Sequence, residues 1–523
     1  MSAAADLVLT NAEIHTLTDP DETYEAVAIR DGEIVRLGTD YDVTFLAGVE
    51  TEEIDLDGHV LLPGFIDAHT HLEMVGRRLV HADLSEADSP EGCLSLLDDA
   101  VNPDREWILG YGYDESSWAE SRLLTREDLD RVSEDRPVVA FREDLHTAGV
   151  NSVALDRFHE EMPDADVRTE SGEPTGVLVE EALDPLFEAT EPGREELQDL
   201  LGAATERATE LGITSVHEMV RGSQAPRVYR DLAREGALPI RVRLNYWSDH
   251  LDGLTEIGLG TNHGGEFVRT GAIKTYTDGS FGARTAKLAE PYADGDTEGD
   301  DGVTTDAAED TGQWVVAPED LHDLVRRADG EGFQMTAHAI GDRAIEATLE
   351  AYEAKADDPE SARHRIEHAE LLNEDLIERF RRTGAVASVQ PNFLRWAEEG
   401  GLYDQRLGER RRKRTNRYAD LLGSDIPLAF GSDCMPLGPL YGIHRVVNAP
   451  TEGQRLPVTE ALRAYTHGAA YAGFDEDRLG TIETGKQADL VALDRSPWDY
   501  SEDIEDVDVS LTVVDSRIVY NSR

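Results

Sequence analysis

The chain has 523 residues, 40% of them hydrophobic, and its 108 acidic against 49 basic residues give a formal net charge of −59. This charge repels phosphate and argues against a nucleic-acid partner, and since no run of about 18 apolar residues occurs, no membrane span is predicted. The two cysteines, Cys93 and Cys434, exclude a disulfide framework and a cysteine-rich zinc ribbon.

The acidic excess also indicates the environment of the protein. A surface of one sign repels itself in dilute buffer, but at molar salt the screening length falls to about 3 Å and most of the repulsion disappears. Residues 1–6 carry neither a basic segment nor an apolar one, so no export signal is predicted. We therefore expect a halophilic protein of a salt-rich cytoplasm.

Both ends of the chain are rich in short β-like runs. Residues 6–46 alternate such runs with turns, and Asp31-Gly32 between two of them predicts a hairpin. Residues 488–520 repeat the pattern. We expect one small β-sandwich domain that is assembled from residues 1–61 and 478–523.

The middle of the chain, residues 62–477, alternates strand-like and helix-like segments. The eight candidate strands are Leu61–Ala68, Ile213–His217, Ile240–Leu244, Ala272–Tyr276, Gln334–Ala337, Arg365–His368, Ala385–Gln390 and Ile426–Ser432. Eight strands with intervening helices predict an α/β fold with a TIM-like (β/α)8 barrel. The surplus length lies mainly at about 76–190, which we interpret as an insertion after barrel strand 1. Its aromatic segment, residues 110–118, either forms a small core of its own, which we favour, or overhangs the barrel mouth.

Two charged segments interrupt the barrel pattern. Residues 294–313 hold eight acidic residues and no basic one, which predicts a solvated loop. Seven basic residues cluster within 406–417. With so much acid elsewhere in the chain, we favour internal ion pairs for this cluster over a site for an anionic substrate.

Active sites of such barrels lie at the C-terminal ends of the strands. Metal-ligating residue types recur there in an ordered series along five of the candidate strands: His69, His71, Lys274, His338, His368 and Asp433. Strand alternation places His69 and His71 on one face, where two imidazoles supply half of a metal site. A single buried histidine is more often a satisfied core residue than a ligand, but recurrence at five strand ends argues against that interpretation here.

The sequences around these residues resemble the amidohydrolase superfamily, and in particular its YtcJ-like branch, which includes N-substituted formamide deformylases. The resemblance extends over nearly the whole chain. The segments that carry it are Pro63–His71, Lys274 with Asp278-Gly279-Ser280, His338–Asp342, Arg365–His368, and residues 146–151, 176–178 and 480–490.

The resemblance implies a centre of two divalent metal ions. His69 and His71 would bind the more buried ion, His338 and His368 would bind the more exposed one, and a carboxylated Lys274 would bridge them. Free lysine is a cation and does not ligate metals at neutral pH, whereas addition of CO2 converts it into an anionic ligand with two oxygens. If Lys274 instead forms an ion pair with nearby acid, the site holds one ion.

Imidazole and carboxylate-type ligands without thiolates suit Zn2+, with Mn2+, Ni2+ and Fe2+ as alternatives. Asp433 would bind metal, take the proton from the attacking water and return it to the leaving nitrogen. Four further residues near strand ends are candidates for substrate binding or for orienting the ligands: His217, Asp278, Arg284 and Gln390. For His217, ordinary packing is an equal alternative.

We therefore predict a metal-dependent hydrolase that cleaves a C–N bond in a small-molecule amide, such as an N-substituted formamide or an N-acyl amine. A deaminase or an ester hydrolase on the same scaffold is the nearest alternative. A catalytically silent scaffold protein is the alternative from another class, although such proteins usually lose several ligands. A homodimer is one option for the assembly, which the sequence does not decide.

Overall fold

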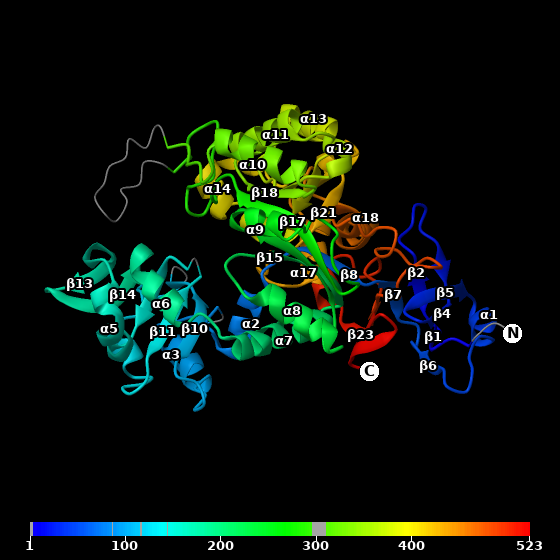
Figure 1. Ribbon diagram of the computed structural model, residues 1–523, viewed down its shortest axis with the longest axis horizontal. Helices are drawn as coiled ribbons and strands as arrows, with labels where there is room; N and C mark the ends of the chain where they lie inside the picture. The colour runs from blue at the N-terminus through cyan, green and yellow to red at the C-terminus, as the bar shows by residue number, and fades with distance from the viewer. Residues whose placement is uncertain (1–3, 86, 116–117, 144, 295–309) are drawn as a thin grey trace. The chain divides into compact units, whose positions relative to one another are not determined.

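The computed structural model (Figure 1) describes residues 4–85, 87–115, 118–143, 145–294 and 310–523. Most of the acidic loop predicted at 294–313 therefore lies outside the described residues. Contacts divide the chain into two compact units. Residues 1–71 and 205–523 form one unit, and residues 72–204 form the other.

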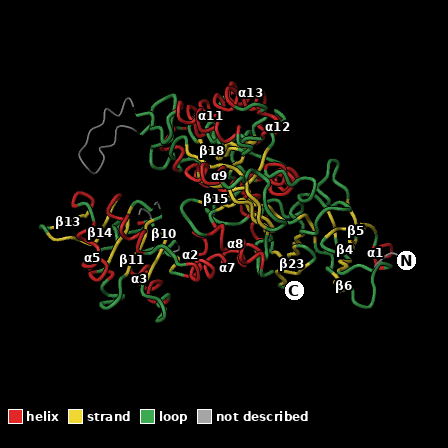
Figure 2. Tube along the Cα trace, in the orientation of Figure 1, coloured by secondary structure: helices red, strands yellow, loops and turns green. Residues whose placement is uncertain are grey.

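The centre of the first unit is a sheet of eight parallel strands in chain order. Two of these strands, β15 and β18, are labelled in Figure 2, where strands are yellow. Its strands are β8 (Phe65–Thr70), β15 (Ile213–Val220), β16 (Arg241–Trp247), β17 (Val268–Tyr276), β18 (Met335–Ala339), β19 (Arg365–His368), β20 (Val386–Val389) and β21 (Leu428–Phe430). The first and last strands meet, because the backbone N–H of Asp433 donates to the carbonyl oxygen of His69 at 2.8 Å. The sheet is therefore a nearly closed barrel, which confirms the predicted TIM-like fold.

Helices follow the barrel strands along the chain. The longer ones that lie entirely in the first unit are α8 (Ala225–Arg234), α10 (Pro318–Gly330), α11 (Asp342–Lys355), α13 (Glu374–Thr383) and α17 (Pro439–Val447). Helix α13 shows why these segments are helical: the Asn373 side chain accepts from the backbone N–H of Leu376 at its start, and the apolar side chains of Leu376 and Phe380 are buried. It ends at Gly384, whose φ of 63° lies in the left-handed region that glycine adopts readily.

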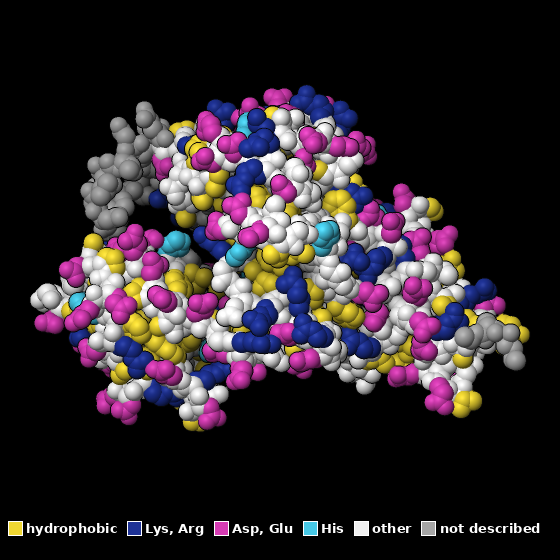
Figure 3. Space-filling model, viewed as in Figure 1, with side chains coloured by type: hydrophobic (Ala, Val, Ile, Leu, Met, Phe, Trp, Pro, Cys, Tyr) yellow, Lys and Arg dark blue, Asp and Glu magenta, His cyan; other side chains and the backbone are white. Residues whose placement is uncertain are grey.

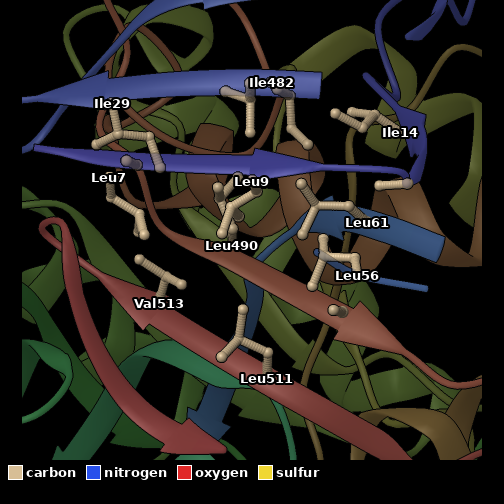
Figure 4. Close-up of a cluster of buried hydrophobic side chains, with 14 of the residues drawn as sticks. Leu7, Leu9, Ile14, Ile29, Leu56, Leu61, Ile482, Leu490, Leu511 and Val513 are labelled. Carbon is tan, nitrogen blue, oxygen red and sulfur yellow. The ribbon is translucent and has the colours of Figure 1, made fainter. Parts of the chain in front are cut away.

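The two chain ends form two further sheets of the first unit. One has the order β5-β4-β1-β6 and the other the order β24-β23-β22-β7-β2-β3. Their strands are β1 (Leu7–Thr10), β2 (Glu13–His15), β3 (Thr23–Tyr24), β4 (Ala26–Arg30), β5 (Glu33–Gly38), β6 (Glu52–Asp55), β7 (Val60–Pro63), β22 (Leu490–Leu493), β23 (Val509–Val514) and β24 (Arg517–Asn521). Leu9, Leu61, Leu490 and Leu511 share one buried cluster (Figure 4), so the sequence ends are joined by a common core. The predicted hairpin joins β4 to β5.

The single strand predicted at Leu61–Ala68 is two strands. β7 pairs with β2 and β22 in the sheet of the chain ends, whereas β8 pairs with β15 in the barrel. Gly64 separates the two strands, and a Cβ there would lie only 2.2 Å from the side chain of Thr214. Sequence hides this break because both strands are buried on both faces and read as one apolar run.

Residues 72–204 form a unit with a core of its own. Its sheet has the order β13-β14-β12-β11-β10-β9. The elements are α2 (Leu72–Val80), β9 (Ala82–Asp83), α3 (Pro90–Asp99), β10 (Ile108–Tyr113), α4 (Arg126–Leu129), β11 (Val138–Arg142), β12 (Thr147–Val150), α5 (Ser152–Phe158), β13 (Val167–Glu170), β14 (Glu173–Val179) and α6 (Asp184–Ala189), with α7 (Arg194–Glu210) crossing into the first unit. Tyr111 and Phe141 lie in one buried cluster, and Tyr113 and Trp118 lie in another. The aromatic segment thus belongs to the unit's own core, as we favoured.

Charged side chains of both signs are scattered over the face of the molecule in Figure 3. The basic cluster at 406–417 is engaged in ion pairs, which include Arg406 with Asp294, Arg410 with Glu290, Arg412 with Asp404 and Arg417 with Asp420. Among the described residues, no helix combines the length and the apolar composition that crossing a bilayer requires.

Candidate metal centre

The first two candidate ligands lie at the end of β8. His69 is 1% exposed, and its Nε2 lies 3.5 Å from Asp433 Oδ1. His71 Nε2 lies 3.2 Å from the same oxygen, and its side chain is one-third exposed. The fold thus places both histidines against the carboxylate predicted as their catalytic partner, although 364 positions separate His69 from Asp433 in the sequence.

His338 and His368 complete the histidine set from β18 and from the end of β19. Their ring centroids lie 4.5 Å apart, and those of His368 and His69 lie 5.2 Å apart. One donor atom each from His69, His368 and Asp433 can be chosen so that all lie within 4.8 Å of one another. Residues from the first, sixth and eighth barrel strands or the segments directly after them therefore converge on one point.

The protonation of these groups suits metal binding. Burial lowers the pKa of His69, lowers that of His368 strongly, and lowers that of His338 to about 3. Burial alone would raise the pKa of Asp433, but the charge of His69 and contact with His71 lower it overall. Neutral imidazoles and an ionised carboxylate offer lone pairs, which is the state that a divalent cation requires of its ligands.

Lys274 lies on β17 and is fully buried. Its Nζ makes no hydrogen bond to any described residue, and it lies 5.3 Å from the centre of the Tyr276 ring. Burial lowers the pKa of its ammonium group to about 8. A buried lysine nitrogen without a hydrogen-bond partner fits a group that carries a further ligand atom better than it fits an ion-paired cation.

The fit to metal is also visible in the histidines. His338 Nδ1 and His368 Nδ1 are buried and have no hydrogen-bond partner among the described residues. Such ring nitrogens are uncommon, since buried polar atoms are nearly always satisfied. Together with the Asp433 carboxylate they form a set of nitrogen and oxygen donors without thiolate, which suits a divalent ion.

A buried carboxylate behind the ligands fixes one of them. Glu367 Oε2 lies 2.7 Å from His69 Nδ1, so that nitrogen is the donor and Nε2 keeps its lone pair toward Asp433. Glu367 also accepts from the Thr336 hydroxyl group and pairs with Arg365 at 2.7 Å. The sequence interpretation did not assign a role to Arg365 or Glu367. The signal available in the sequence was that two charged residues lie inside a strand, directly before and directly after the apolar Ile366.

Backbone geometry shapes the same site. Asp433 has φ 53° and His368 has φ 70°, both in the left-handed region that non-glycine residues rarely adopt. Asp67 helps to hold the turn at Asp433, because its Oδ1 accepts from the backbone N–H groups of His69 and Ser432. Strain of this kind persists where surrounding contacts determine the conformation, which is common at functional sites.

The four candidates for substrate binding lie in different surroundings. Asp278 accepts from the backbone N–H groups of Ile340, Gly341 and Lys287, and its Oδ1 lies 3.6 Å from His338 Nε2. Gln390 is buried, with Nε2 3.4 Å from His69 Nδ1. Both lie directly behind the histidines, where they can orient them.

His217 and Arg284 make contacts with charged residues. His217 lies inside β15, three residues before its end, and its Nδ1 lies 2.8 Å from Arg365 Nη1 in the barrel interior. Arg284 pairs with Asp294 at 2.9 Å. Because β15 is longer than predicted, His217 lies below the barrel rim, and its contacts are those of a core residue.

One further acidic residue near the centre was missed. Glu370 follows His368 by two positions and is 2% exposed, and burial raises the pKa of its carboxyl group to about 8. Its position could not be inferred from strand alternation, because Ala369 also has a positive φ, 46°, and breaks the alternation.

Comparisons with known proteins agree with this geometry. A model of a family described as the amidohydrolase family matches residues 52–520. The Bacillus subtilis (strain 168) protein named "Putative amidohydrolase YtcJ" is 32% identical over 97% of this chain and 98% of its own length. The N-substituted formamide deformylase of Arthrobacter pascens is 26% identical over 99% of both chains. A crystal structure of an uncharacterized metal-dependent hydrolase from Pyrococcus furiosus matches with a TM-score of 0.78 and 31% identity, over 94% of this chain and 99% of that one.

Proposed function

Because the chain belongs to the amidohydrolase family, we propose that it is a metal-dependent hydrolase that cleaves the C–N bond of a small-molecule amide with water. N-substituted formamides and N-acyl amines are the substrates that we favour, since a formamide deformylase is among the relatives. The observation that carries the proposal is the convergence of His69, His368 and Asp433 donor atoms within 4.8 Å.

Six residues would hold the metal. His69 and His71 would bind one ion, His338 and His368 would bind a second, and a carboxylated Lys274 would lie between them, with Asp433 as a further ligand. The unpaired, buried Nζ of Lys274 supports this arrangement over the alternative with one ion. The donor set suits Zn2+, and Mn2+, Ni2+ and Fe2+ remain the alternatives.

The reaction needs a base, an electrophile and a proton donor for the leaving group. Bound divalent ions supply Lewis acidity and lower the pKa of water to about 7. Asp433, whose Oδ1 lies 3.2 Å from His71 Nε2, accepts a proton from the attacking water. Water oxygen bonds to the carbonyl carbon, the C–N bond breaks, and Asp433 returns the proton to the departing nitrogen. The products are a carboxylic acid and an amine.

Metal content and an amide screen together test this proposal. We expect protein purified in molar KCl without chelator to contain one or two equivalents of a divalent metal, and to release amine from at least one amide of the panel. Ammonia release from amino-heterocycles instead would indicate a deaminase, and turnover of esters alone would indicate an esterase. Metal-free protein that stays inactive after Zn2+ is added would contradict the proposal and favour a silent scaffold.

We also place the protein in a salt-rich cytoplasm, which the net charge of −59 and the presence of only two cysteines support. A homodimer is the assembly that we propose to check first, by light scattering in molar KCl.

A further inference from the structure

Glu370 has a buried carboxyl group with few hydrogen-bond partners. Its side chain receives a hydrogen bond from the Tyr403 hydroxyl group, but its Oε2 has no hydrogen-bond partner within the described ranges. None of the described arginine, lysine or histidine side chains forms an ion pair with it. The charged groups that act on it are Asp278 and Asp433, which are both acidic.

Two more buried acceptor oxygens belong to the same region. Gln390 Oε1 and Asn416 Oδ1 also lack hydrogen-bond partners among the residues that the structure describes. Hydrogen bonds link the three residues through backbone groups and Tyr418. The Asn416 backbone N–H donates to the Glu370 backbone carbonyl oxygen at 2.8 Å, Asn416 Nδ2 donates to Tyr418 Oη at 2.9 Å, and Tyr418 Oη donates to the Gln390 backbone carbonyl oxygen at 3.0 Å. Buried acceptors without donors are rare and indicate a missing N–H group.

Aromatic rings connect this region to the candidate metal centre. The Phe393 ring stacks on His368 with centroids 5.7 Å apart, and Trp396 lies 4.7 Å from Phe393. The Tyr403 ring, whose hydroxyl group contacts Glu370, lies 6.2 Å from Trp396. These residues come from the segments after β19 and β20, at the C-terminal end of the barrel where substrates bind in this fold. The Arg395 guanidinium already lies 4.4 Å from the centre of the Trp396 ring, so the rings of Phe393 and Tyr403 remain beside the Glu370 carboxyl group for a further cation.

We propose that Glu370, with the rings of Phe393 and Tyr403, forms a subsite for an ammonium group of the substrate. Glu370 Oε2, which is buried and has no hydrogen-bond partner among the described residues, accepts an ammonium N–H. The inference builds on the proposed hydrolase function and narrows its substrates to amides that carry a cationic amino group apart from the scissile bond.

Binding tests the subsite without any turnover. Calorimetry compares butylammonium with the neutral butanol on the metal-loaded protein, on Glu370→Gln and on Glu374→Gln, the last being a matched loss of an exposed carboxylate four residues away. We expect the wild-type protein and Glu374→Gln to bind butylammonium about tenfold tighter than butanol or better, as a charge-assisted hydrogen bond provides. Glu370→Gln should lose this preference. Equal binding of the two probes by wild-type protein, or a preference that persists in Glu370→Gln, overturns the subsite.

Turnover then connects the subsite to the reaction. Each amide with a terminal ammonium group is paired with a twin that ends in a methyl group, and kcat/KM is measured for both. We expect a preference of about tenfold for the ammonium substrate in wild-type protein and a similar loss in Glu370→Gln, mainly through KM, with the methyl twin unaffected. Hydrolysis of both twins at equal rates overturns the subsite alone. If neither twin nor any other amide is hydrolysed, the proposed function fails, and the binding result still decides whether the subsite exists.

Discussion

The two ends of the barrel bury charged groups in opposite ways. At the strand starts, Arg241 makes two contacts with Asp489, at 2.7 and 3.1 Å, and Arg243 and Arg269 both pair with Asp475. At the strand ends, Lys274 Nζ, His338 Nδ1 and Glu370 Oε2 have no hydrogen-bond partner among the described residues. Strand β17 shows both cases, since it runs from paired Arg269 to unpaired Lys274. Paired charges at one end serve the fold, whereas open polar groups at the other end are available for ligands.

The largest expected difference between the two ends of the barrel comes from substituting Asp433, the proposed base. We expect Asp433→Asn to lower kcat by about 10²–10⁴-fold, because asparagine cannot accept the proton of water. The free energy of unfolding of the metal-free protein should change far less than the rate, since asparagine loses only the contacts with His69 and His71 and adopts a positive φ readily. Chemical denaturation in molar KCl and initial rates on the best amide measure the two effects. A large loss of stability with little loss of rate would mean that Asp433 serves the fold and not the reaction.

At the opposite end the effect should be on stability. Asp489→Asn leaves the buried Arg241 with only Asp515, at 3.5 Å, as an acidic partner. Breaking a buried pair of this kind costs about 3–5 kcal/mol, and we expect the lower part of that range because Asp515 remains. The kcat of the folded protein should stay as in the wild type, which urea titration and rate measurements on one sample can show.

A residue between the ends should affect metal affinity. Glutamine at position 367 presents an amide that can donate to His69 Nδ1, which favours the wrong tautomer and turns Nε2 into a donor. We expect Glu367→Gln to weaken metal binding by about 10–100-fold, as removal of a carboxylate behind a histidine ligand generally does. Competition with a chromogenic chelator measures the affinity. Unchanged affinity with a lowered kcat would assign Glu367 to the reaction and not to the orientation of His69.

The smallest effect provides the reference for the others. Arg207 and Glu210 form an exposed pair at 2.7 Å on α7. Exposed pairs contribute little, so Glu210→Gln should change the free energy of unfolding by at most about 0.5 kcal/mol and leave metal affinity unchanged. A larger change would mean that exposed charges contribute as much as buried ones to the free energy of unfolding of this acidic protein.

Sequence reasoning succeeded where residue type and strand order carry the information. The histidine pair, the lysine and the late aspartate lie at or near the C-terminal ends of the first, fourth and eighth barrel strands, so a barrel brings them together without knowledge of side-chain contacts. The same reasoning placed the hairpin at Asp31-Gly32, because two residues of this type have a specific turn preference.

Sequence reasoning was insufficient where contacts between residues far apart in the sequence determine the role of a side chain. Glu367 is adjacent in sequence to His368, a candidate ligand, but only its 2.7 Å contact with His69, 298 positions away, indicates its role. Glu370 was hidden by two consecutive residues with positive φ, which no residue-type pattern signals. Arg284 attracted attention by its place after a strand, whereas its partner Asp294 lies in a loop whose conformation the sequence does not specify.

Gly64 has a practical consequence for anyone who wishes to redesign the protein. It joins β7, which pairs with β22 from the C-terminal part of the chain, to β8, whose fifth residue is His69. Only a few residues therefore separate the sheet of the chain ends from His69, the first candidate metal ligand. Fusion partners or truncations that disturb β22 should shift the position of His69. An affinity tag or a domain swap is therefore better introduced at a site that does not contact β22.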